Sequence, residues 1–136
     1  MTGVRDHTEL DVWNLCDELC RQISDVIERP GFASHRKLRE QIEEAAESPC
    51  PNIAEGFARY FPRDNARFVR IARGSLSELI VHLGWAKARR LITAAEADSL
   101  CSLALRAIRA ATGYILYLQS ATPPKPARKP KNKTNS

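Results

Sequence analysis

The sequence lacks the motifs from which most catalytic and metal sites are built. Its three histidines, His7, His35 and His82, are scattered and stand outside any H-E-x-x-H or comparable frame. It has no glycine-rich phosphate loop, and no carboxylates form a pair inside an obvious pocket. We therefore expect a protein without enzymatic activity, without a cofactor and without a bound metal ion.

Cysteine is sparse and is not arranged for disulfides or zinc. Cys16, Cys20, Cys50 and Cys101 form no C-x-x-C pair and do not reach the density of a disulfide scaffold. Cys16 and Cys20 share one helix face, but both belong to an apolar row, so we favour core packing over metal binding. The pattern predicts small buried thiols in a reducing, cytoplasmic compartment.

Long apolar runs are missing as well. The longest uncharged stretch, residues 110–124, is too short and too polar to span a membrane. The first residues, MTGVRDHTELDVW, contain no apolar core and no small-residue cleavage site, so we expect no signal peptide. We predict a cytoplasmic protein that has no membrane partner.

The sequence does contain strong helical periodicity. Four segments repeat apolar residues at a spacing close to 3.6, and none alternates with the period of two that strands show. These segments span 10–27, 38–60, 68–86 and 100–118. Short connections join them, which is typical of an antiparallel, up-down-up-down four-helix bundle. We predict an all-α fold with an N-terminal extension over residues 1–8, the bundle over 9–121 and a tail over 122–136.

Helix-breaking and helix-capping residues mark the boundaries between these segments. Pro30 and Gly31 end the first segment, and Pro62 suits the first turn of a helix, where its missing N–H costs nothing. Thr93 and Glu96 are spaced as a capping box, in which each side chain can bond the other's backbone N–H. We expect the fourth helix to begin there.

Two prolines interrupt the second segment. Inside a helix, Pro49 and Pro51 would each cost about 3 kcal/mol through a lost hydrogen bond and a ring clash. A helix that restarts with Ser48 as its N-cap would place both prolines in the first turn, where no bond is lost. We predict a kinked second helix, and we favour bending for packing over a direct ligand role. Gly56 in the restarted helix indicates that another backbone passes close to it.

The net charge of +5 comes from the end of the chain. Residues 122–136 contain four prolines, no acidic residue and no large apolar residue, so we predict a disordered tail. Its five basic residues equal the net charge, which leaves the rest of the chain formally neutral. They are Lys125, Arg128, Lys129, Lys131 and Lys133.

A second basic element lies on the third helical segment. The arginine row consists of Arg63, Arg67 and Arg70, with Arg59 before it and Arg73 beside it. We expect the row to lie well away from the apolar stripe that contains Phe68. A row of arginines can follow a phosphate backbone, and a solvated charged face is the alternative, so the residues alone leave both interpretations open. Glu55 precedes Arg59 by four residues, the favourable order for an exposed ion pair.

Two stretches, NIAEGFAR and DNARFVRIARGSLSELIVHLGWAKA, resemble a known family. Its members are four-helix-bundle proteins described as encoded by intervening sequences within bacterial 23S ribosomal RNA genes. They are distantly related to the accessory protein of diversity-generating retroelements. The resemblance extends from about Gln41 to Ala88, and the flanking helices match in type, including LDVW near the start.

The resemblance implies a bundle that assembles as a homopentamer and has no known catalytic activity. In the retroelement branch the ring partners a reverse transcriptase and binds RNA or DNA through a basic surface. The resemblance implies packing and subunit-contact roles for the residues that match the family motif, which are Asn52, Glu55, Gly56, Gly74, Ser75 and Glu78. Glu43 and Glu44 stand where the family usually has two basic residues, and this departure removes part of any basic surface.

From these observations we predict a non-enzymatic, oligomeric accessory protein that binds nucleic acid, a reverse transcriptase, or both. The predicted binding residues are those of the arginine row and the basic tail. The alternative is a scaffold for protein–protein interactions that has no nucleic-acid role.

Overall fold

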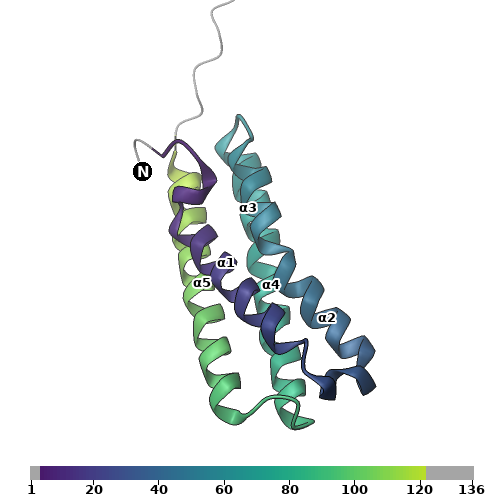
Figure 1. Cartoon of the computed structure of the whole chain (residues 1–136). Helices are drawn as coiled ribbons and strands as arrows, with labels where there is room; N and C mark the ends of the chain where they lie inside the picture. The colour runs from purple at the N-terminus through teal and green to yellow at the C-terminus, as the bar shows by residue number, and fades with distance from the viewer. Residues whose placement is uncertain (1–3, 122–136) are drawn as a thin grey trace, which may run out of the picture.

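A computed structural model describes residues 4–121 and contains helices but no strand over that range, so the predicted all-α class is confirmed (Figure 1). Two short 3-10 helices, η1 (His7–Glu9) and η2 (Pro30–Ser34), lie at the start and near the first turn of the chain. The α-helices are α1 (Asp11–Val26), α2 (Arg36–Glu47), α3 (Pro49–Phe57), α4 (Pro62–Ala88) and α5 (Ala94–Ser120). The predicted disordered tail, 122–136, lies outside the described residues.

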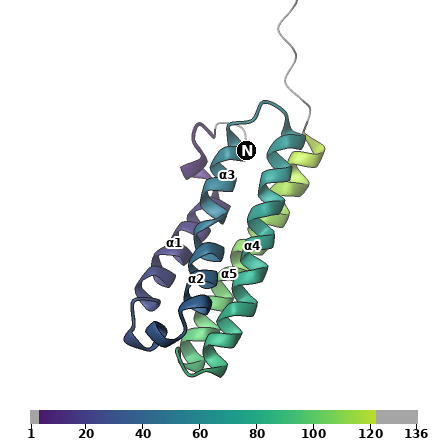
Figure 2. The ribbon, with the colours of Figure 1, turned by 90° about the vertical axis from the view of Figure 1, so that its right-hand side faces the viewer.

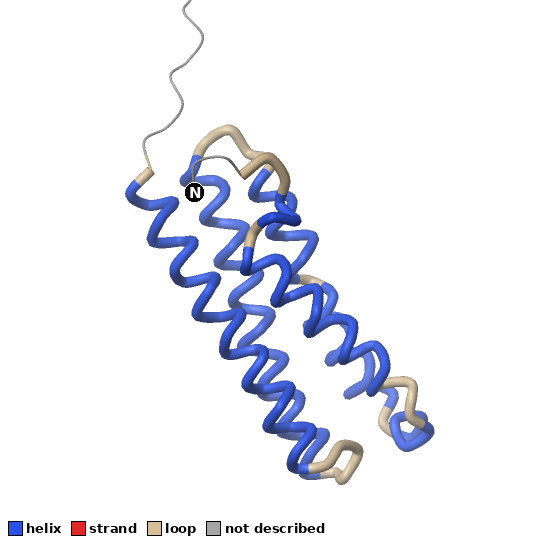
Figure 3. The backbone as a smooth tube through the Cα atoms, turned by 60° about the vertical axis from the view of Figure 1, so that its left-hand side comes forward, coloured by secondary structure: helices blue, strands red, loops and turns tan. Residues whose placement is uncertain are grey.

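The helices lie side by side along one long axis (Figures 1 and 2). The chain runs along α1, returns along α2 and α3, runs back along α4 and returns along α5 (Figure 1). α4 packs against α5 and against both α2 and α3, while α1 packs against α5, α2 and α3. The longer loops lie at the two ends of the molecule (Figure 3). The start of α4 and the end of α5 therefore come together at one end.

Small and branched apolar residues fill the core between these helices. Leu76 and Leu79 of α4 are completely buried, as are Ala104, Ala107 and Ala111 of α5. Alanine at successive buried positions lets two helices approach closely, because little side-chain volume separates their backbones. The close pairing of α4 with α5 follows from this pattern.

The predicted break occurs at Ser48. α2 ends at Glu47 and α3 begins at Pro49, so both prolines stand in the first turn of α3. The predicted cap is wrong in one respect, because the Ser48 side chain makes no hydrogen bond to a backbone N–H of α3. Its Oγ instead accepts hydrogen bonds from Asn52 Nδ2 at 3.1 Å and from Ser75 Oγ at 2.9 Å. A link to α4 has replaced the cap.

The predicted capping box at the start of α5 is confirmed. Thr93 Oγ1 accepts a hydrogen bond from Glu96 N at 3.1 Å, and Glu96 Oε1 accepts one from Thr93 N at 2.9 Å. The Arg29 guanidinium also pairs with both carboxylate oxygens of Glu96. These contacts lower the pKa of Glu96 to about 2, with the Arg29 hydrogen bonds as the largest cause.

Two residues of the predicted apolar rows are exposed. Tyr60 is 52% exposed because α3 ends at Phe57, before the helical spacing reaches it. Ile71 is 44% exposed because the buried row of α4 passes through Val69 and Ala72 on either side of it. No helix within residues 4–121 is long and apolar enough to cross a membrane.

Candidate functional site

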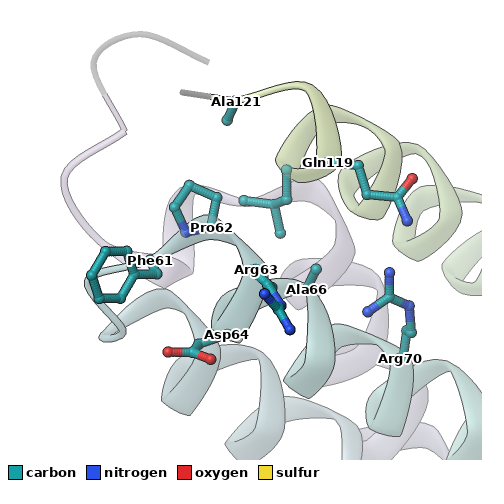
Figure 4. A pocket seen from close by; sticks show the side chains of 9 residues that line it. Phe61, Pro62, Arg63, Asp64, Ala66, Arg70, Gln119 and Ala121 are labelled. Atoms are coloured by element: carbon teal, nitrogen blue, oxygen red, sulfur yellow. The ribbon is translucent and has the colours of Figure 1, made fainter. Parts of the chain in front are cut away.

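A cavity of about 620 Å³ opens at the end of the molecule where α4 begins and α5 ends (Figure 4). Its lining comes from the segment that enters α4 and from the last turn of α5. The lining residues are Phe61, Pro62, Arg63, Asp64, Ala66, Arg70, Leu118, Gln119 and Ala121. We call this cavity the α4–α5 pocket. It brings two members of the predicted arginine row next to the last described residue of the chain.

Local sequence rules place the two arginines in this pocket. Phe61 is extended, with φ −96° and ψ 132°, and Pro62 starts α4 because its fixed φ suits a first helical turn. Arg63 and Arg70 are seven residues apart, which is about two helical turns, so they share one face of α4. In Figure 4 their side chains extend on the side of α4 that faces Gln119, and Asp64 points the other way.

The positive charge of the pocket is not neutralised by ion pairs. Within the described residues, neither Arg63 nor Arg70 has an acidic side chain within ion-pair distance. Among the described residues of the lining, Asp64 is the one acidic residue, so these residues together carry a net charge of one positive unit. Both guanidiniums are exposed and can bind an anion in two-pronged fashion.

The remaining arginines of the predicted row have other contacts. Arg59 and Arg67 both lie against the ring of Phe68, with 4.8 and 4.7 Å from guanidinium carbon to ring centroid. The expectation that the row lies well away from Phe68 is therefore wrong, because half-buried Phe68 sits at the edge of the core where Arg67 covers it. Arg59 also forms the expected exposed pair with Glu55, at 2.7 Å.

Arg73 links two helices. Its Nη1 donates a hydrogen bond to Thr112 Oγ1 of α5 at 3.2 Å, and the side chain is half-buried. The structure thus divides the five predicted arginines into three groups: Arg63 and Arg70 at the pocket, Arg59 and Arg67 at Phe68, and Arg73 between helices.

Two residues of the family motif stabilise the break in the chain's second long helical segment. Asn52 Nδ2 donates hydrogen bonds to the backbone oxygen of Ser48 at 2.9 Å and to its Oγ at 3.1 Å. Ser75 of α4 donates to the same Oγ at 2.9 Å. Asn52 and Ser75 therefore hold the start of α3 against α4 within one chain.

Gly56 also packs within its own chain. A Cβ atom added there would lie 2.9 Å from the backbone oxygen of Asn65 and 2.9 Å from Phe68 Cβ, both in α4. The backbone that passes close to Gly56 is therefore that of α4. A subunit contact is not needed to explain this glycine.

Asn65 and Tyr114 form a buried polar contact that sequence reasoning missed. Asn65 is 6% exposed, and its Nδ2 donates a hydrogen bond to Tyr114 Oη at 2.9 Å. Asn65 Oδ1 is buried without a hydrogen-bond partner among the described residues and lies against Gly56. Burial raises the pKa of Tyr114. The sequence did contain one sign of this contact. Asn65 is a polar residue at a position of α4 that the apolar repeat places in the core.

The other motif residues face outward. Glu55, Gly74 and Glu78 are exposed, and apart from its chain neighbours and the nearby backbone of α4, no described atom lies within 4 Å of a Cβ placed on Gly74. Val81 and Trp85 of α4 are also exposed, at 54% and 49%. We call Gly74, Val81 and Trp85 the outer face of α4. The predicted subunit contact remains a prediction. The outer face of α4 could accommodate it, because Gly74, Val81 and Trp85 are exposed.

A second cavity, of about 580 Å³, lies between α2 and α4. Its lining is acidic and polar, and the buried His82 Nδ1 beside it has no hydrogen-bond partner among residues 4–121. The lining residues are Gln41, Glu44, Ala45, Ser48, Ser75, Glu78, Val81 and His82. Within the described chain no group of three His, Cys, Asp or Glu residues is arranged to hold a metal ion. The acidic lining makes this cavity a poorer anion site than the α4–α5 pocket.

The cysteines are free thiols. Cys16 is buried as predicted, while Cys20, Cys50 and Cys101 are only partly buried. Burial raises the pKa of both Cys16 and Cys50 to about 12. Because the thiolate is the nucleophilic form, neither sulfur is activated at neutral pH.

The predicted basic tail residues, Lys125, Arg128, Lys129, Lys131 and Lys133, lie outside the described residues. Their starting point is nevertheless defined, because Ala121 lines the α4–α5 pocket. The last described residue of the chain therefore lies beside Arg63 and Arg70 of the lining.

Comparison with known proteins gives a family. No curated protein matches this chain. The model of a family described as 23S rRNA-intervening sequence protein matches residues 8–113, which include all of α1 to α4 and most of α5. The match covers well over half of the 136 residues. The chain therefore belongs to the 23S rRNA-intervening sequence protein family.

Proposed function

We propose that this protein is a non-enzymatic, oligomeric accessory protein that binds nucleic acid at the α4–α5 end of the molecule. The observation that carries the proposal is that Arg63 and Arg70, which have no acidic partner among the described residues, line a pocket from which the basic tail continues. A phosphate backbone is the natural partner of such a surface, because affinity for nucleic acid comes largely from Arg and Lys contacts to phosphates.

The quaternary part of the proposal is a cytoplasmic homopentamer of antiparallel, up-down-up-down four-helix subunits, with α2 and α3 as one kinked member. In a ring the α4–α5 pocket would be repeated once per subunit. Repetition raises affinity through effective concentration, so weak contacts at single pockets would add up along one nucleic-acid strand. A reverse transcriptase is the protein partner that this arrangement would serve, by holding its template.

The test is a titration of labelled structured RNA and DNA at two salt concentrations. We expect deletion of residues 122–136 to weaken binding partly and to flatten its salt dependence, since the tail contributes mainly non-specific charge. We expect Arg63→Glu with Arg70→Glu to weaken binding much more, because both residues line the pocket. Arg106→Glu with Arg109→Glu is the matched control, because it makes the same charge change at exposed positions of α5 away from the pocket lining.

A second function is supported by a different observation. Val81 and Trp85 leave apolar surface on the outer face of α4, which suits protein contacts. If wild-type protein binds no nucleic acid at low salt, a protein-interaction scaffold is the function that remains.

A further inference from the structure

The α4–α5 pocket has an apolar part and a cationic part. Phe61, Pro62 and Leu118 provide an apolar part, and Phe61 is 49% exposed at its rim. Arg63, Arg70 and the Gln119 amide provide cationic and hydrogen-bonding groups beside it (Figure 4). A nucleotide has the same two parts, a flat base that stacks on aromatic rings and a phosphate that pairs with guanidinium groups.

The aromatic ring at the rim is held in place. Tyr60 meets the Phe61 ring edge-on, with the ring centroids 4.9 Å apart and the planes at 87°. This contact leaves a face of the Phe61 ring for another group, whereas Phe68 is already covered by Arg59 and Arg67. Among the described residues that line the pocket, Phe61 is the aromatic one.

The size of the pocket favours an unpaired nucleotide over a duplex. Pockets of about 300–1,000 Å³ enclose ligands of small-molecule size, and this one measures about 620 Å³. A paired base is stacked inside the double helix and cannot reach such a pocket without flipping out. A base from a single strand or a loop can enter directly.

We propose that the α4–α5 pocket binds an unpaired nucleotide of single-stranded RNA or DNA. The base stacks on Phe61, and the phosphate pairs with Arg63 and Arg70. This inference rests on the proposed function and makes it narrower, since it names single strands and loops as the preferred substrate.

The test compares a labelled twelve-nucleotide oligo-U with a labelled RNA duplex of the same total charge, using the full chain at one salt concentration. Wild type should bind the single strand more tightly. Phe61→Ala should weaken single-strand binding at least about fivefold, the effect of losing one base–aromatic stack, and should leave duplex binding within about twofold. Leu105→Ala is the matched control, because Leu105 is similarly exposed, at 47%, on α5 outside the pocket lining and outside the outer face of α4, and it should change neither affinity.

Arg63→Gln with Arg70→Gln should weaken binding of both probes, and circular dichroism checks that each variant is folded. Equal wild-type affinity for the two probes, or an unchanged affinity of Phe61→Ala for oligo-U, would overturn the nucleotide pocket and leave the proposed function standing. Absence of wild-type binding to either probe would overturn the proposed function itself.

Discussion

At the scale of single residues, two glycines of the same motif region have opposite environments. Gly56 is buried where a side chain would meet the α4 backbone, while Gly74 faces open space among the described residues. The sequence indicated that Gly56 is approached by a backbone, because a glycine inside a helix is costly. It gave no means of knowing whether that backbone belongs to the same chain or to another subunit, and the structure assigns it to α4.

This contrast gives a matched pair of substitutions. Gly56→Ala should lower the free energy of unfolding by about 1–3 kcal/mol, because the added Cβ meets backbone and Phe68 Cβ atoms that cannot move freely. Gly74→Ala should raise it by about 0.5–1 kcal/mol through better helix propensity. Urea unfolding followed by circular dichroism measures both. A Gly56→Ala protein as stable as wild type would contradict the close packing of α3 on α4.

The polar residues show where prediction from sequence stops. The Thr93–Glu96 capping box could be predicted because it depends on neighbours in the sequence. The pairing of Arg29 with Glu96 could not, because 67 residues separate them and helix packing alone brings them together. The same holds for Ser48, which sequence rules made a helix cap and which the structure links to Ser75 across 27 residues.

At the scale of helices, the start of α5 is fixed by one carboxylate. Glu96 belongs to the capping box and also pairs with Arg29, which lies between α1 and η2. These contacts hold its pKa at about 2, so ionised Glu96 stabilises the folded state. The stabilisation is complete above the ordinary carboxyl pKa of about 4.5 and is lost as the pH falls toward 2.

Glu96→Gln should therefore lower the free energy of unfolding by about 0.5–1 kcal/mol at neutral pH, because it removes the charge that pairs with Arg29 and lies at the N-terminus of α5, while a glutamine keeps the capping-box hydrogen bond. The difference from wild type should shrink steadily between pH 4.5 and pH 2, because wild-type Glu96 becomes protonated there. Urea unfolding at a series of pH values tests this. Glu40→Gln is the control, since exposed Glu40 has no ion pair within the described chain. A difference that stays constant down to pH 2 would disprove the role of the charge.

At the scale of the whole molecule, the all-α class followed from periodicity, since four segments had a 3.6-residue repeat. The α4–α5 pocket could not be predicted from this periodicity. Arg63 and Arg70 were predicted as part of one row with Arg67, yet the pocket they line also needs Gln119 from the far end of the chain. Spacing on one helix places side chains on a face, but it does not show which neighbouring helix completes that face.

Assembly is the prediction that belongs to this scale. If the outer face of α4 forms the subunit contact, Val81→Glu should shift the protein from about five times 15.2 kDa to smaller species in light scattering, because a buried carboxylate is costly. Leu105→Glu changes an equally apolar exposed position on α5 and should leave the assembly intact. A wild type that is monomeric at micromolar concentration would exclude the ring altogether.

The central claim is that Arg63 and Arg70 bind phosphates, and the salt dependence of affinity tests it most directly. For single-stranded RNA, affinity falls as salt rises, and each lost phosphate contact reduces the magnitude of the slope of log affinity against log salt by about 0.7. We predict that Arg63→Gln with Arg70→Gln reduces the magnitude of this slope by about 0.7 for each pocket that holds a phosphate, and by more when several pockets of a ring hold the same strand. The control pair Arg106→Gln with Arg109→Gln should leave it unchanged. Equal slopes for wild type and the pocket pair would contradict the account.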